Sequence, residues 1–157
     1  MDHQYRVTKF NPEAESYDEW CAISDVGSSY SGIEFTHQEY ERVESSYIEA
    51  VLRFMKASKI ESLTLSNFWN GFDYSDSALI LAENTEYRND SLKQIIKLIL
   101  REKIGGQLTS KNGMFVHFGY DYYMYIGISR HYPKVVSSIQ SLGLYVESFE
   151  SPYLDSE

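Results

Sequence analysis

Residues 36–59, THQEYERVESSYIEAVLRFMKASK, carry the clearest periodic pattern in the chain. Their apolar residues recur at spacings of three and four, which places one stripe along a helix: Tyr40, Val43, Tyr47, Val51 and Phe54. Thr36 precedes Glu39 by three residues, the pattern of a capping box that begins a helix. The stretch therefore predicts a long amphipathic helix that ends near Lys59 and packs one face against another layer.

Two further helices are predicted in the second half of the chain. Asp90 is expected to cap the first of them, and its broad apolar side should lie flat on a sheet. The pair Gly105 and Gly106 is expected to stop it. Pro133 is expected to begin a short third helix that ends before Gly143.

Strands are predicted from alternation and from short apolar runs. Segments 114–118 and 122–129 flank Gly119-Tyr120-Asp121 and predict a β-hairpin. Other expected strands are 5–10, 20–24, 61–66 and 144–149. The sequence also predicts an aromatic loop at 67–72, whereas 78–82 is too short to assign by its period.

The interspersed helices and strands predict an α+β fold. We expect a mostly antiparallel sheet with two long helices and one short helix packed on one face. A chain of 157 residues fits one domain, and we assign residues 1–150 to it. Residues 151–157 are expected to fray.

The charge of the chain is concentrated in one segment. Residues 12–49 contain ten acids and one base, Arg42, whereas the rest of the chain carries thirteen of each sign, so the segment accounts for the net charge of −9. Such a field attracts a basic protein and repels nucleic acid and anionic lipid. The alternative interpretation is an acidic surface that only keeps the protein soluble.

Composition excludes several classes of protein. A single cysteine, Cys21, excludes an internal disulfide and favours a reducing compartment. The N-terminus lacks the pattern of a signal peptide, and no window approaches the about 20 apolar residues of a membrane span. Lys93, Lys97 and Arg101 are interpreted as a solvated helix face and not as a nucleic-acid site. We therefore expect a cytoplasmic protein that binds neither membrane nor nucleic acid.

Catalytic and metal-binding patterns are sparse. The four histidines are dispersed, which predicts no metal site, and no nucleotide or dinucleotide motif indicates a cofactor. Two hydrolase hypotheses remain open. Asp18, Glu19 and Asp25 flank Trp20, an arrangement found in glycosidases, and His117 precedes the hairpin turn and could act as a general base. The favoured interpretation is nevertheless a protein without enzymatic activity.

Several blocks taken together resemble small bacterial immunity proteins of polymorphic toxin systems. The resemblance covers most of the chain and lies in the order of the blocks, because no single block is a chemical signature. The chain departs from the pattern at Gly105-Gly106, where an aromatic residue is expected. The blocks are YRVTKFNPE (5–13), DEWCAISDVG (18–27), FTHQEYERVESSYI (35–48), LILREKI (98–104) and FVHFGYDYYMYIG (115–127).

The resemblance implies a non-catalytic inhibitor that binds a cognate secreted toxin domain, often a nuclease. The acidic and aromatic residues independently suit a basic partner, because carboxylates can stand in for phosphates and aromatic rings can fill pockets. A general protein-binding adaptor is the other non-enzymatic alternative. The residues expected to contact the partner are Asp18, Glu19, Trp20, Asp25, Tyr30, Glu34, Glu41, Tyr120, Tyr122 and Tyr123.

Overall fold

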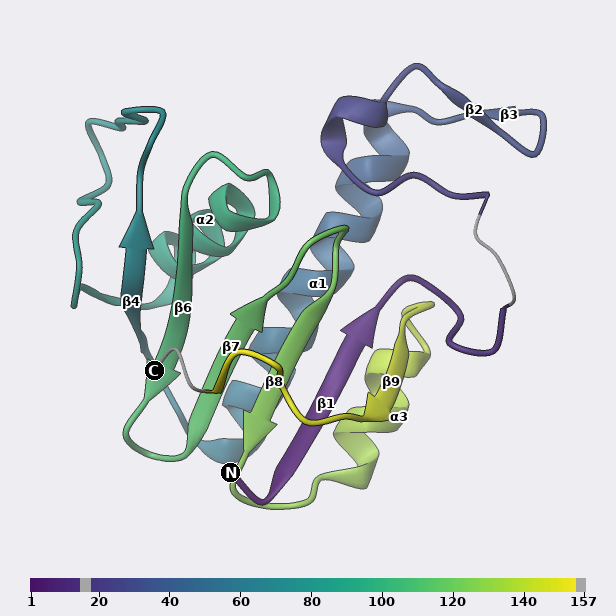
Figure 1. Ribbon diagram of the computed structural model, residues 1–157. Helices are drawn as coiled ribbons and strands as arrows, with labels where there is room; N and C mark the ends of the chain where they lie inside the picture. Colours follow the sequence, from purple (N-terminus) through teal and green to yellow (C-terminus); the bar gives the residue numbers. More distant parts are fainter. Residues whose placement is uncertain (15–17, 155–157) are drawn as a thin grey trace.

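The computed structural model describes residues 1–14 and 18–154. Within these ranges, a seven-stranded antiparallel sheet has the order β5-β4-β6-β7-β8-β1-β9, and α1, α2 and α3 all lie on one of its faces (Figure 1). The α+β class and the antiparallel sheet are thus confirmed. The strands are β1 (His3–Thr8), β4 (Leu63–Trp69), β5 (Glu86–Tyr87), β6 (Gly105–Ser110), β7 (Met114–Phe118), β8 (Met124–Ile128) and β9 (Tyr145–Ser148); the helices are α1 (His37–Ser58), α2 (Asn89–Leu100) and α3 (Pro133–Gln140).

Helix α1 forms where its period predicts. The Thr36 side chain accepts a hydrogen bond from the Glu39 N–H at 3.1 Å, and the helix ends where Lys59 adopts a left-handed φ of 57°. The five residues of the predicted stripe are all buried against the sheet. Burial of this stripe, more than helix propensity, holds α1 in place, because isolated helices are marginal in water.

The β7–β8 hairpin is also confirmed, and its register defines two faces of the sheet. Val116 lies opposite Ile126 and is buried beneath the helices. His117 lies opposite Tyr125, and Phe115 lies opposite Gly127, so these residues occupy the other face because side chains alternate along a strand. We call this second side the outer face of the sheet.

The segment after Ser148 crosses the outer face and covers its centre (Figure 1). Ser151 is buried, its Oγ lies 2.7 Å from His117 Nδ1, and its N–H donates to Gln4 Oε1 at 2.9 Å. Residues 151–154 belong to the tail that was expected to fray, and in the structure these polar contacts and the Tyr153 ring join the segment to the sheet. Residues 155–157 lie outside the described part of the chain.

Helix α2 ends earlier than predicted. It stops at Leu100, and Glu102, three residues before Gly105, adopts a left-handed φ of 60°. Gly105 and Gly106 instead begin strand β6, which pairs with β4 and β7. The expectation that these glycines stop the helix was wrong, because neighbouring strands supply hydrogen-bond partners that the local sequence does not reveal.

Other boundaries differ around the N-terminal loop and β4. The expected strand at 20–24 is a loop that leads into a short 3₁₀ helix, η1 (Ile23–Asp25), and a small hairpin follows, β2 (Ser29–Tyr30) and β3 (Ile33–Glu34). Strand β4 continues to Trp69, through part of the segment expected to be an aromatic loop. Residues 78–82 contain no helix or named strand, and Leu79 forms an isolated bridge with Asp76.

Candidate functional site

The acidic segment is partly neutralised by bases from elsewhere in the chain. Within it, Glu19 pairs with Lys9 at 3.1 Å, Glu44 with Arg101 at 2.8 Å and Glu49 with Arg53 at 3.1 Å. Glu39 pairs with Arg42 inside the segment. The exposed negative charge that remains includes Glu34 on the β2–β3 hairpin and Glu41, which contacts His37 at 2.8 Å near the start of α1.

Two of the aromatic residues expected at an interface belong to the core. Trp20 is 7% exposed and stacks on Phe35 with ring centroids 4.4 Å apart. Tyr122 is 5% exposed and donates its phenol hydrogen to the Tyr40 hydroxyl at 3.0 Å. Both residues close the end of the core beside α1, so neither is available as an anchor for a partner in this structure.

Burial also changes the acidity of groups in this end of the core. It raises the pKa values of the Tyr40, Tyr47 and Tyr122 phenols well above the ordinary value of 10.0, because the phenolate would lose its hydration. Burial lowers the pKa of Lys9 although Glu19 opposes the shift. The Lys9 ammonium lies 4.3 Å from the Trp20 ring centroid, so this lysine is part of the aromatic packing.

The carboxylates that suggested hydrolysis serve local structure. Asp18 Oδ2 accepts hydrogen bonds from the Ser31 N–H and hydroxyl at 2.8 and 2.9 Å, and Asp25 Oδ2 accepts from the Cys21 N–H at 2.8 Å. Glu19 holds Lys9. These contacts fix the loop around Trp20, and Trp20 itself faces the core rather than an open cleft between the acids.

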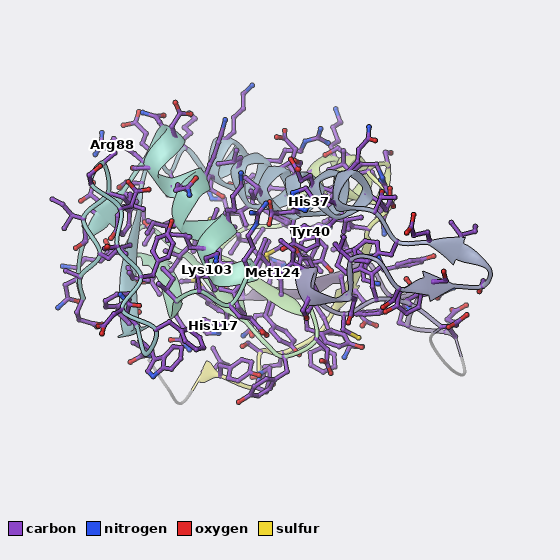
Figure 2. All side chains as sticks on the ribbon, turned by 90° about the horizontal axis from the view of Figure 1, so that it is seen from above. His37, Tyr40, Arg88, Lys103, His117 and Met124 are labelled. Atoms are coloured by element: carbon purple, nitrogen blue, oxygen red, sulfur yellow. The ribbon has the colours of Figure 1, made fainter. Side chains whose placement is uncertain are left out.

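His117 is equally removed from solvent. Its side chain is fully buried on the outer face, stacked on Phe115 at 4.2 Å and covered by Ser151 and Tyr153. Figure 2 labels His117 on the side of the C-terminal segment, away from Tyr40 on the helix side. A general base needs contact with its substrate, and here the C-terminal segment would have to move first. Among the described residues, no group of three or more acidic, histidine or cysteine side chains could hold a metal ion.

A large open groove lies between the C-terminal end of α2, the start of β6 and the β7–β8 turn. Its volume is about 1060 Å³, slightly above the range of about 300–1000 Å³ usual for ligand sites. Its inner wall includes the apolar residues Ile99, Ile104 and Phe118. Three large aromatics form part of its rim with much of their surface in solvent: Trp69 is 54% exposed, Phe72 is 71% exposed and Tyr120 is 82% exposed.

Local structure holds the rim in place. The Trp69 and Phe72 rings meet edge to face at 5.5 Å, on either side of the Asn70-Gly71 turn. Asn70 braces this turn by accepting from the Tyr74 N–H and donating to the Tyr74 carbonyl, each at 2.9 Å. Lys103 extends over the Tyr74 ring at 5.9 Å and adds a positive charge to the groove. Large exposed aromatics gathered around one groove are typical of binding sites.

The residues expected at the interface lie in separate regions of the structure. Tyr120 stands at the groove and is exposed, as an anchor requires, while Tyr30 and Tyr123 are half-buried. The acids Asp18, Glu19, Asp25, Glu34 and Glu41 gather instead around the β2–β3 hairpin and the start of α1. Both regions lie toward the upper end of the molecule as drawn in Figure 1.

The sequence-based reasoning missed Trp69, Phe72 and Lys103 as candidate site residues. The clustering of aromatics in 67–72 was the available signal, because large rings on either side of an Asn-Gly turn lie at a loop, and loops run over the protein surface. Their convergence with Tyr120 depends on the strand order, which places β4 and β7 on either side of β6.

Comparison with protein-family models, with curated proteins and with solved structures found no match to this chain. None of the helices in the described ranges is long and apolar enough to cross a membrane.

Proposed function

We propose that the protein is a non-catalytic inhibitor of the immunity type, which binds and neutralises a basic toxin domain. The observation that carries the proposal is the exposed aromatic rim of the groove, formed by Trp69, Phe72 and Tyr120. Trp and Tyr residues supply much of the energy of protein interfaces when they enter pockets of a partner. We call these three residues the aromatic rim.

Because the net charge of the chain is −9, we expect the partner to be positively charged. Exposed carboxylates on the β2–β3 hairpin and α1 would accelerate the encounter with a basic domain, and the aromatic rim would then supply short-range binding energy. The order of sequence blocks, which resembles bacterial immunity proteins, supports a toxin as that partner. An adaptor could use the same surface, so the test must measure neutralisation as well as binding.

The test uses a toxin domain encoded beside this gene, expressed from a repressible promoter in a heterologous bacterium. Wild-type protein should restore growth and form a stable complex with the toxin domain. The triple change Trp69→Ala, Phe72→Ala and Tyr120→Ala should weaken binding by a hundredfold or more, since hot-spot residues contribute about 2 kcal/mol or more each. It should leave the fold intact because all three side chains are exposed.

Ile80→Ala is the matched control. Ile80 is 74% exposed on the loop between β4 and β5, but it is not among the residues that line the groove. Its replacement should leave both growth rescue and affinity unchanged. Full neutralisation by the triple variant would contradict the proposed role of the aromatic rim, and failure of the wild-type protein to bind the toxin domain would contradict the inhibitor function itself.

A further inference from the structure

The groove coincides with a place where two neighbouring strands part. The pairing of β6 with β7 runs from Ser110 opposite Met114 to Leu108 opposite Val116 and ends there. A continued register would place Gly106 opposite Phe118, but these two residues are not paired with each other. Both line the groove, which therefore opens into the sheet itself.

The direction of the backbone groups at this opening follows from the neighbouring ladder. Leu65 of β4 donates to the Thr85 carbonyl at 2.9 Å and accepts from the Asn84 N–H at 2.8 Å, so its N–H and C=O point away from β6. Leu65 lies opposite Leu108. In an antiparallel ladder such a pair directs its backbone groups to opposite sides, so those of Leu108 point toward β7.

The same alternation extends to the parted residues. Gly106 precedes Leu108 by two positions. The β4–β6 register shifts beside it, but the extra residue lies on β4, since Gln107 and Gly105 remain opposite Ser66 and Trp69. The alternation along β6 therefore directs the N–H and C=O of Gly106 toward β7. Phe118 follows Val116 by two positions and directs its groups toward β6. The opening is therefore flanked by two strands that present backbone donors and acceptors toward one another across the groove, as the edges of two separate sheets would.

We propose that an extended segment of the protein partner enters this opening and forms main-chain hydrogen bonds with β6 at Gly106 and with β7 at Phe118. The proposal rests on the inhibitor function and specifies how the partner binds. An exposed strand edge readily takes up an added strand, for which the main chain supplies affinity and alternate side chains supply specificity. Here edges on both sides of the segment would be satisfied at once.

The residues around the opening suit a guest backbone. Gly105, Gly106 and Gly119 all line the groove and add no side chain to it. The space that a Cβ would need is filled by Leu65 at Gly106 and bordered by Tyr153 and Tyr125 at Gly119, so these two glycines also serve the packing of the chain itself. Alternate side chains of the guest would point toward the apolar wall of Ile99 and Ile104. The remaining side chains would point toward the outer face near Tyr153. The guest should therefore carry apolar residues at every second position.

The first test uses synthetic peptides as probes, chosen by panning a phage-displayed library of random linear sequences against the full chain. Bound peptides should be extended, with apolar residues at alternate positions. Each peptide is then methylated at one backbone nitrogen at a time. Because strand residues direct N–H groups alternately to the two sides, and both sides here have partners, methylation at each central position should lower affinity about tenfold or more.

The second measurement is amide hydrogen exchange by NMR on the same complexes. Exchange at Gly106 and Phe118 should slow by at least tenfold when peptide is bound. Thr109, which already lies opposite Thr64 in the β4–β6 ladder, is the internal control and should change little. Failure to select any peptide, tolerance of methylation along the peptide, or unchanged exchange at Gly106 and Phe118 in a bound complex would each overturn strand insertion.

Failure of this proposal is distinguishable from failure of the inhibitor function. If the toxin domain still requires the aromatic rim while the peptides show no main-chain pairing, the inhibitor function stands and strand insertion is wrong. If the peptides insert but the toxin domain is not neutralised, the opening is a strand-binding site and the toxin is not its partner.

Discussion

At the scale of single residues, Glu44 shows how the chain places a charge where its helical pattern calls for an apolar side chain. Its side chain is 2% exposed and is held by both nitrogens of the Arg101 fork, Nε at 2.8 Å and Nη2 at 3.0 Å. The pair joins α1 to the end of α2. The hydrogen bonds that Arg101 donates to the Glu44 carboxylate raise the pKa of Arg101 and keep its charge fixed.

Removal of the carboxylate should therefore leave a poorly solvated guanidinium without its partner. We expect Glu44→Gln to lower the free energy of unfolding by about 3 kcal/mol, the lower end of the range for breaking a buried ion pair, because Arg101 keeps partial access to water. Urea denaturation measures the change. Glu41→Gln on the exposed side of α1 is the control and should cost less than about 0.5 kcal/mol. Equal effects of the two changes would contradict a buried pair.

Replacement of the two tryptophans by alanine should have contrasting effects on stability and on partner binding. Trp20→Ala removes a ring that stacks on Phe35 and touches Tyr40 and Tyr122, and should cost about 3–5 kcal/mol of stability. Trp69→Ala removes an exposed ring and should cost far less while weakening partner binding. Thermal and urea unfolding of the two variants measure the contrast. A Trp20→Ala protein as stable as wild type would place Trp20 at the surface after all.

At the scale of elements, strongly periodic or sharply bounded segments could be predicted from the sequence. Helix α1, the β7–β8 hairpin and α3 follow from their apolar spacing, their turn and Pro133, respectively. Strand β6 could not be predicted, because GGQLTS contains two glycines and has a single buried aliphatic residue, Leu108. It is a strand because β4 and β7 lie beside it, and that tertiary information is also what creates the groove.

The contact between α1 and the segment before β8 predicts a dependence on alkaline pH. Tyr47 donates to the Tyr122 carbonyl at 2.8 Å, and Tyr122 donates to Tyr40 at 3.0 Å. The unfolded chain loses phenol protons near pH 10.0, whereas the folded state retains them because its pKa values are raised. The native state then binds more protons than the unfolded state, so stability must fall as pH rises above this value.

The titration of Lys9 has the opposite effect on stability in the pH range up to that of ordinary lysine. Its lowered pKa makes stability rise with pH until unfolded lysine has titrated near 10.5. Above about pH 10.5 the tyrosines should therefore dominate, with a loss of up to about 1.4 kcal/mol per pH unit for each group. Denaturation series at several alkaline pH values measure the slope. Tyr122→Phe should reduce the slope of stability against pH by the contribution of about one phenol. An unchanged slope would contradict the burial of this phenol.

At the scale of the whole molecule, the sequence predicts where the acidic residues are concentrated. It does not predict which of these carboxylates form ion pairs and which stay exposed. The excess of acids in residues 12–49 is a property of the sequence, but their partners Lys9, Arg53 and Arg101 come from other elements. Asp18, Glu19 and Asp25, which are predicted to contact the partner, also hold their own loop. Exposed acids that remain, such as Glu34 and Glu41, lie at the end of the molecule that bears the β2–β3 hairpin, and this is the field that we expect a basic partner to meet (Figure 1).

The last prediction concerns this field. Glu34→Gln combined with Glu41→Gln should lower the rate constant for association with the toxin domain several-fold at low salt, because steering charges act mainly on the encounter. Dissociation should change little. The difference from wild type should shrink as salt is raised toward about 0.15 M, where charges more than about 8 Å apart are largely screened. Stopped-flow mixing at several salt concentrations measures both rates.

Asp2→Asn combined with Glu61→Gln provides a control with the same change in net charge. These two acids lie near the opposite end of the sheet, where the chain begins and α1 leads into β4 (Figure 1). If the effect depends on position, this pair should leave the association rate nearly unchanged. Equal slowing by the two double variants would show that only the total charge of −9 matters, and the acidic end of the molecule would then not be part of the encounter surface.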